Sequence, residues 1–309
     1  MKVLVGVDGS ANSFAAVEFV GRLLSPERDQ LVLLFATPAI SFEDDRLDPA
    51  VEARARAALG ATVLEAAGER LPAEWRRRAV KREIAGSASA RLLEAADAEH
   101  ADLLALGQRG TSGIVESMLG GVSRAIAHSA KIAVLIVKNE PASDEPTKQS
   151  PGPAERHMHV LMAVGESPSP EKMASLLKRF TWPPETRGWA MKVVRRQFVC
   201  DLPNWIKVER NADVAAMASA WEAEHQQNVV ECRTELEVFR TMLPQCFIDE
   251  ELVVSEGRPA EEILAQSRKK AIDLIVLGSQ TAGTLKRLLL GSTSEQVLRN
   301  APCSVLIVR

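Results

Sequence analysis

Leu103–Val137 reads LLALGQRGTSGIVESMLGGVSRAIAHSAKIAVLIV, and Leu274–Val308 reads LIVLGSQTAGTLKRLLLGSTSEQVLRNAPCSVLIV. Each stretch runs from an apolar strand through a glycine-bearing loop and a helix to a second apolar strand. The glycines before and after the loop match between the copies at one offset of 171 residues. A constant offset over 35 residues indicates an internal repeat, and it predicts two copies of one domain in the chain of 309 residues.

Strand and helix patterns alternate from the start of the chain to the first repeat. This alternation predicts a parallel sheet that is covered by helices on both faces. The expected strands of the first half are Lys2–Val7, Gln30–Ala36, Arg78–Ile84, Asp102–Leu106 and Ile132–Val137, and the expected helices are Ser13–Leu24, Pro49–Arg70, Ala88–Glu99 and Met118–Ser129.

A Pro-, Ser- and charge-rich stretch, KNEPASDEPTKQSPGPAE, then interrupts the pattern and indicates a linker. The expected domains are 1–139 and 157–309, with residues 140–156 between them. The second half has 14 more residues than the first before its glycine loop, which we place near Phe198–Val208. Its expected strands are Val160–Val164, Trp189–Arg195, Phe247–Ser255, Ile272–Leu277 and Cys303–Val308, and its expected helices are Glu171–Phe180, Asn211–Met242 and Arg258–Lys270.

The glycine loops are the stretches that most suggest a binding site. A glycine at the carboxyl end of a strand lets the backbone turn sharply and lets a ligand approach the main chain. A second glycine then opens a helix, where unpaired N–H groups and the helix dipole favour an anion. In a parallel sheet, ligands bind beyond the carboxyl ends of the strands, where Asp8, Ala36 and Gly107 are expected.

The opening VGVDGSANSFAAVEFV and the stretch from Leu104 to Lys138 resemble the universal stress protein family. The stretch from Leu104 to Lys138 resembles that family's glycine signature, which runs Gly, two residues, Gly, nine residues, Gly, then Ser or Thr. The second half resembles the same domain, so nearly the whole chain looks like a tandem member. The resemblance implies two Rossmann-like α/β domains of the adenine nucleotide alpha hydrolase type, each with a five-stranded, mostly parallel sheet and helices on both faces. It also implies that the two fifth strands pair, which would form an internal pseudo-dimer.

In family members that bind ATP, the turn aspartate meets the adenine end and the glycine loop surrounds the phosphates. The first half matches this pattern but carries glycine at position 121, where the pattern has Ser or Thr. A hydroxyl donor is lost there, which is worth about 0.5–1.5 kcal/mol. The resemblance implies binding residues at Asp8, Ala36, Gly107, Gly110, Gly120, Gly121 and Ser123.

The second half departs further from the pattern. Gly165 replaces the aspartate, and Thr281 replaces the second glycine of the signature. A β-branched Thr crowds the loop and does not readily adopt a positive φ. The sequence therefore predicts a weaker site here, which keeps an anion-binding main chain at Gly278, Gly291, Ser292 and Ser294.

Three functions follow as hypotheses. The first is a regulatory stress-response protein that binds ATP, with or without Mg²⁺, or another adenine nucleotide, chiefly in the first domain. The second is an interaction protein in which both loops only support the fold, and the third is a slow ATP hydrolase. We find no Walker-type lysine, no Ser-His-acid set and no other catalytic residue, so at most weak ATPase activity is expected.

Bulk composition argues against several kinds of partner. The net charge of -3 and the aromatic content of 4% predict no nucleic-acid binding. No apolar run reaches 18 residues, so we expect no membrane span. The chain begins directly with a strand pattern, so a cytoplasmic location with reduced cysteines is expected. The cysteine and histidine spacing predicts no metal site. A further homo-oligomer and an unidentified protein partner remain hypotheses.

Overall fold

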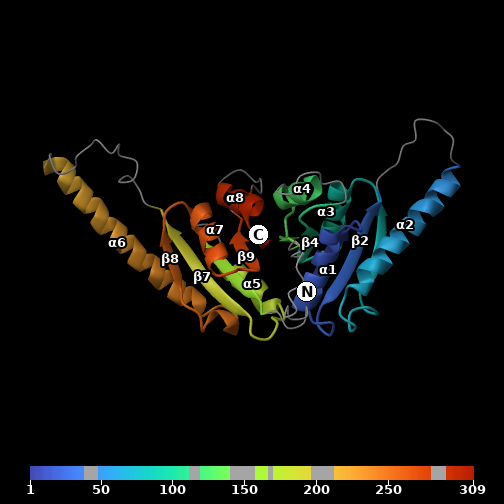
Figure 1. The fold of residues 1–309 in the computed structure, drawn as a ribbon, viewed down its shortest axis with the longest axis horizontal. Coiled ribbons are helices and arrows are strands. Elements are labelled where there is room, and N and C mark those ends of the chain that lie inside the picture. Colours follow the sequence, from blue (N-terminus) through green and yellow to red (C-terminus); the bar gives the residue numbers. More distant parts are fainter. Residues whose placement is uncertain (38–47, 111–118, 140–156, 166–169, 196–211, 280–289) are drawn as a thin grey trace, which may run out of the picture.

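A computed structural model describes residues 1–37, 48–110, 119–139, 157–165, 170–195, 212–279 and 290–309. These residues form two α/β domains that share one sheet, with strand order β3-β2-β1-β4-β5-β10-β9-β6-β7-β8. Figure 1 shows the two halves on either side of a central contact, with α4 and α8 facing each other across it. The expected linker 140–156, the expected insertion near Phe198–Val208 and Thr281 lie outside the described residues.

The first domain follows the alternation that the sequence predicts. Its helices are α1 Ala11–Leu23, α2 Pro49–Glu69, α3 Ala88–Ala98 and α4 Gly121–Ser129. Its strands are β1 Lys2–Val7, β2 Gln30–Thr37, β3 Val80–Ala85, β4 Leu103–Gly107 and β5 Ala133–Val137.

The second domain repeats this order. Its helices are α5 Pro170–Arg179, α6 Ala212–Arg240, η3 Gln245–Phe247, α7 Pro259–Lys269 and α8 Ser292–Asn300. Its strands are β6 His159–Val164, β7 Arg187–Val194, β8 Val253–Glu256, β9 Leu274–Gly278 and β10 Ser304–Val308.

All pairings within each domain are parallel, which confirms the predicted fold class. Among the described strands, the one antiparallel pairing joins the domains, where β5 lies beside β10 with Val305 opposite Ile136 and Ile307 opposite Val134. This pairing confirms the internal pseudo-dimer that the resemblance implied. The two fifth strands therefore lie at the centre of the sheet, and β3 and β8 form its edges.

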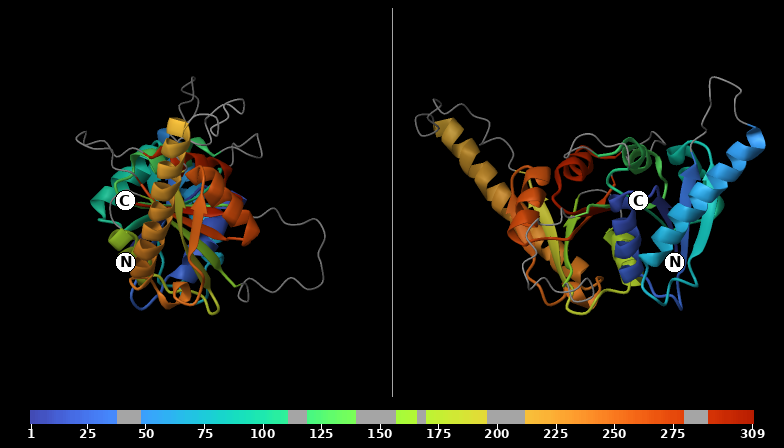
Figure 2. Two further views of the ribbon diagram at one scale, coloured as in Figure 1. Left: turned by 90° about the vertical axis from the view of Figure 1, so that its left-hand side faces the viewer. Right: turned by 45° about the vertical axis from the view of Figure 1, so that its right-hand side comes forward.

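Apolar side chains fill both faces of the sheet, because successive residues of a strand point to opposite sides. On β1, Val3 and Val5 enter one core and Leu4 enters the other. The first core lies under α1, α2, α5 and α6, and the second under α3, α4, α7 and α8. Each core runs through both domains. The long helices α2 and α6 lie at the two outer ends of the molecule (Figures 1 and 2).

Two expected elements differ from the structure. The predicted strand Phe247–Ser255 is wrong over its first part, where a 3₁₀ helix ends at Phe247 and the strand begins only at Val253. Phe247 is buried with its ring against the backbone of Gly188, so it belongs to the core and not to a ladder. Helix α4 begins at Gly121, later than the predicted start at Met118, and Gly120 is its N-cap.

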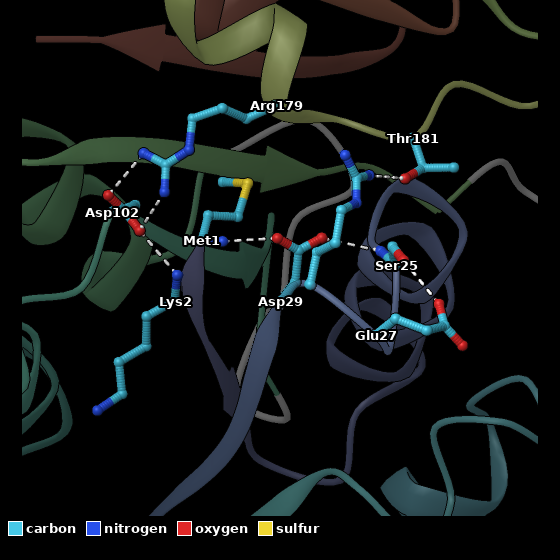
Figure 3. A network of polar contacts seen from close by, with 9 residues as sticks. Met1, Lys2, Ser25, Glu27, Asp29, Asp102, Arg179 and Thr181 are labelled. Carbon is cyan, nitrogen blue, oxygen red and sulfur yellow. Dashed lines mark hydrogen bonds and ion pairs between the residues drawn. The ribbon is translucent and has the colours of Figure 1, made fainter.

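Polar contacts also join the two domains, at the amino ends of β1 and β4 (Figure 3). Arg179 of α5 donates two hydrogen bonds to Asp102, both of 2.8 Å. The backbone N–H of Lys2 donates to the same carboxylate at 2.7 Å. Nearby, Arg28 donates to the Thr181 hydroxyl at 2.7 Å, and the Thr181 N–H donates to the Leu23 carbonyl at 2.8 Å.

Two cations at the strand ends form matching contacts across the centre. Lys138 follows β5 and donates to the carbonyl of Ala301, which caps the end of α8. Arg309 follows β10, at the equivalent position of the second domain, and donates to the carbonyl of Ala127 in α4. The last carbonyls of a helix carry partial negative charge, so a cation is stable at each place.

We expect Asp102→Asn to weaken the contact between the domains in a pH-dependent way. Burial opposes ionisation of Asp102, but hydrogen bonds from Arg179 and the Lys2 N–H outweigh it, so the pKa lies below its ordinary value of 3.8. Because the pKa of Asp102 is lower in the folded state, its ionised carboxylate stabilises the fold at pH values above the unfolded-state pKa. This stabilisation is lost as the pH falls through the lowered folded-state pKa. The wild type should therefore have a higher urea midpoint than the variant at pH 7, and the gap should shrink as pH falls below about 4.

Asp97→Asn is the matched control, because Asp97 forms an exposed ion pair with Lys131 within the first domain. Such surface pairs contribute about 0–1 kcal/mol. Equal midpoints for Asp102→Asn and Asp97→Asn at pH 7 would contradict the role given to Asp102.

Candidate functional site

The turn after β1 fixes the Asp8 carboxylate. Gly9 has φ of +85°, a conformation that favours glycine, and it brings the chain back toward the strand end. The Ser10 N–H then donates to Asp8 Oδ1 at 3.0 Å, and the Asp8 N–H donates to the Ser13 hydroxyl at 3.3 Å. The carboxylate is therefore held by its own turn, beyond the carboxyl end of the strand.

Ser10 joins this turn to the glycine loop. Its hydroxyl accepts from the Ser13 N–H at 3.2 Å, which caps α1, and donates to the Arg109 carbonyl at 3.3 Å. Arg109 lies between the first two glycines of the loop. The β1 turn and the start of the loop are thus connected through one side chain.

Gly107 and Gly110 both lie where an added Cβ would meet a neighbouring atom at close range, but the neighbouring atoms differ. A Cβ on Gly107 would lie 2.5 Å from the backbone carbon of Asn12 and 2.7 Å from the Ser13 nitrogen, so α1 packs directly on this residue. A Cβ on Gly110 would lie 2.3 Å from Asp8 Oδ2. The structure thereby brings together Asp8 and Gly110, two residues that the resemblance assigned to one site.

The amino end of α4 meets the electrostatic requirement for an anion. Gly120 is the N-cap and provides no side-chain cap, and the first turn contains no acidic residue. The first N–H groups of a helix lack partners within the helix and carry partial positive charge. Gly121 is exposed, and a Cβ there would meet nothing within 4 Å, so this end of the helix has room beside it.

Two further predicted site residues, Ser123 and Ala36, lie within a helix and a strand and not in the glycine loop. The buried Ser123 hydroxyl donates to the Gly107 carbonyl at 2.7 Å and so connects α4 to the end of β4. Ala36 is partly exposed near the end of β2, opposite Ile84 of β3. Ala36 thus lies near the carboxyl end of its strand, as predicted, and Ser123 of α4 lies against the carboxyl end of β4.

The second domain keeps the same scaffold. Ser294 donates to the Gly278 carbonyl at 3.1 Å, as Ser123 does to Gly107. The Ser279 N–H donates to the Val308 carbonyl at 2.8 Å, and in the first domain the Gln108 N–H donates to the Val137 carbonyl at 2.7 Å. Gly291 is the N-cap of α8, without a side-chain cap, and Ser292 is exposed in its first turn.

The two sites differ in charge. Gly165 follows β6 where Asp8 follows β1, so the second domain has no carboxylate at this turn position. The first turn of α8 contains Glu295, whereas α4 has Arg124 at the equivalent position. A carboxylate at a helix amino end opposes a bound anion, and a cation favours one. Of the two helix amino ends that the structure describes, that of α4 is therefore the more favourable for an anion.

Sequence reasoning did not assign a role to Arg109 or Arg124. The sequence features that could have pointed to them are the positive charge of Arg109 between the first two glycines of the loop and that of Arg124 in the helix that follows.

Among the described residues, no group of three or more His, Cys, Asp or Glu side chains could hold a metal ion. No described helix has both the length and the apolar character needed to cross a membrane.

We expect Gly107→Ala and Gly278→Ala to differ in their effect on stability. The new methyl group at 107 collides with the backbone of α1 and should cost about 1–3 kcal/mol of unfolding free energy. At 278 the nearest atom to the new Cβ is Met173 Sδ at 3.5 Å, an ordinary contact, so the cost should stay within about 0.5 kcal/mol. Urea unfolding of the two variants measures the difference, and equal losses would show that Gly107 does not support α1 as described.

The chain resembles known proteins over its whole length. A universal stress protein from Mycolicibacterium smegmatis is 25% identical over 321 residues, which cover 99% of this chain and 96% of that protein. One from Mycobacterium tuberculosis is 30% identical over 139 residues, 44% of this chain and 94% of the relative. Other curated relatives match only in part, and the match to one from Methanocaldococcus jannaschii, 50% identical over 54 residues, spans 32% of its length.

A solved structure that matches the whole chain shows the same fold. A universal stress protein from Archaeoglobus fulgidus covers 100% of this chain with a TM-score of 0.58, 20% identity and 96% of its own chain matched. A universal stress protein in complex with cAMP is 29% identical over 44% of this chain and 96% of its own, with a TM-score of 0.36. The model of the universal stress protein family matches residues 1–138 and 206–309. The chain belongs to the universal stress protein family.

Proposed function

We propose that the first domain binds an adenine nucleotide such as ATP, and that its occupancy serves a regulatory role in a stress response. The observation that carries this proposal is the position of the Asp8 carboxylate against Gly110, beside a helix amino end that has no acidic residue. An adenine nucleotide needs hydrogen-bond acceptors and donors at its base and ribose, and N–H donors and positive potential at its phosphates. The first site offers the carboxylate at one end and the amino end of α4 at the other.

The residues fit the two parts of such a ligand in different ways. The Asp8 carboxylate would accept hydrogen bonds from the nucleoside end. The N–H groups of the first turn of α4 would donate to phosphate oxygens, as helix amino ends commonly do. Gly110 and Gly121 would allow the ligand to approach the main chain. The second domain lacks the carboxylate and has Glu295 in the helix turn, so we propose one working site per chain.

We expect Asp8→Ala to weaken binding of ATP at least about 5-fold, since a hydrogen bond to a charged group is worth that much or more. Calorimetric titration of the full chain with ATP and Mg²⁺, and with AMP and cAMP, measures the affinity, and native mass spectrometry counts the ligands. Asp48→Ala is the matched control, because Asp48 Oδ1 accepts from Ala50 N–H at 2.8 Å in the same type of turn, at the start of α2.

One nucleotide per chain, weakened by Asp8→Ala and not by Asp48→Ala, would support the proposal. Two per chain would contradict the single site. If no adenine nucleotide binds at millimolar concentration, the proposal fails, and an interaction protein with glycine loops that serve the fold becomes the better reading.

We expect Gly121→Ser to strengthen ATP binding about 2- to 10-fold, because it supplies the hydroxyl donor that the family pattern has at this position. The position has room for the side chain, so the thermal midpoint should not fall. Gly121→Ala is the control, since it adds the Cβ without the hydroxyl. Equal affinities for the two variants would show that the hydroxyl does not reach the ligand.

A further inference from the structure

Two cations lie beside each other at the ends of β4 and β5. Arg109 follows Gln108, whose N–H donates to the carbonyl of Val137 at 2.7 Å, and Lys138 follows Val137. The hydrogen bond holds the two strand ends together, so the residues that leave them start from neighbouring points. The Arg109 carbonyl is fixed in turn by the Ser10 hydroxyl at 3.3 Å.

Neither cation has a carboxylate partner within the described residues. The Nε atom of Arg109 is buried and has no hydrogen-bond partner there. The amine of Lys138 donates to the Ala301 carbonyl, which is a neutral group. A buried donor without a partner costs about 1–3 kcal/mol, and a charged one costs more. Next to the glycine loop the structure therefore keeps one guanidinium whose Nε has no partner, and one amine whose acceptor is a helix carbonyl and not a carboxylate.

The two charges also repel each other. Burial is the main cause that lowers the pKa of Lys138 below its ordinary value; Cys303 acts against this shift, and the positive charge of Arg109 adds to it to a smaller extent. An anion between the two side chains would remove this repulsion and would supply an acceptor for Arg109 Nε. A phosphate group is well suited, because it offers several acceptor oxygens and more than one negative charge.

The second domain does not repeat the pair. Arg309 occupies the position equivalent to Lys138, but the sequence has Gln280 at the position equivalent to Arg109. The pair is thus confined to the domain that also holds Asp8. The position of Lys138 thus carries a cation in both domains, whereas Arg109 is the cation that only the first domain adds beside it.

We propose that Arg109 and Lys138 form an anion site at the edge of the first glycine loop that takes the terminal phosphates of a nucleotide and so favours ATP over AMP. The inference rests on the proposed adenine-nucleotide function and assigns the part of the site that reads the length of the phosphate chain. Because Lys138 also contacts Ala301 of the second domain, the terminal phosphates would lie against the contact between the domains.

Calorimetric titration of the full chain with ATP, AMP and sodium tripolyphosphate tests this inference. Arg109→Gln and Lys138→Gln each remove one charge, and the first loses no hydrogen bond of its side chain in the described structure. Lys131→Gln is the matched control, since Lys131 precedes the same strand at its other end and is paired with Asp97. Thermal unfolding of every variant verifies the fold.

We expect each variant of the pair to lose at least about 10-fold in affinity for ATP, as charge-assisted hydrogen bonds commonly contribute. The affinity for AMP should change less than about 2-fold, and Lys131→Gln should bind ATP as the wild type does. A purely structural role would weaken ATP and AMP together. Equal losses for the two nucleotides, or no loss for ATP in either variant, would overturn the inference.

The tripolyphosphate arm separates this inference from the proposed function. If no nucleotide binds but tripolyphosphate binds and is weakened in both variants, the anion site stands and its ligand is a free polyphosphate. If AMP and ATP bind with the same affinity and tripolyphosphate does not bind, the nucleotide site stands and the anion site is wrong.

Discussion

The antiparallel pairing of β5 with β10 is the contact on which the rest of the structure depends. Parallel domains of this kind leave their last strand with one unpaired edge of N–H and C=O groups, and such an edge invites further pairing. Here each edge is satisfied by the other, with Leu306 opposite Leu135 and both side chains buried. The same pairing extends both apolar cores through the two domains. It also places Lys138 against α8 and Arg309 against α4, so each domain contacts the last helix of the other.

The two domains share one scaffold but differ in charge. The hydrogen bonds that connect the loop to the last strand, and the serine that connects the last helix to the fourth strand, occur in both halves at equivalent positions. These contacts are required by the fold, whatever the loop binds. The carboxylate of Asp8 and the cations at 109 and 124 occur only in the first half. A charge that the fold does not need is free to differ between the copies, so the shared scaffold does not explain why these three residues are present in the first half.

Much of the fold could be predicted because its signals are local. The apolar strands, the helix of 29 residues at α6 and the repeat all follow from short-range patterns. Phe247 shows where that reasoning fails, since an apolar residue near a strand can instead fill a gap over Gly188 in the core. The Asp102–Arg179 ion pair joins residues 77 apart in the sequence, and no periodicity connects them. For the same reason the loop motif does not show that Arg109 and Lys138 leave neighbouring strand ends.

The sequence by itself determined the α/β class, the two copies and the residues that match the family's glycine signature, because backbone turns and strand burial depend on residue type at short range. Only the tertiary structure decided which of those residues meet. In the folded chain Asp8 lies against Gly110, and α1 packs directly on Gly107. The buried Ser123 hydroxyl donates to the Gly107 carbonyl at the end of β4. The physical reason is that such contacts arise when strand ends far apart in the chain lie side by side at one edge of the sheet, and this arrangement follows from strand order.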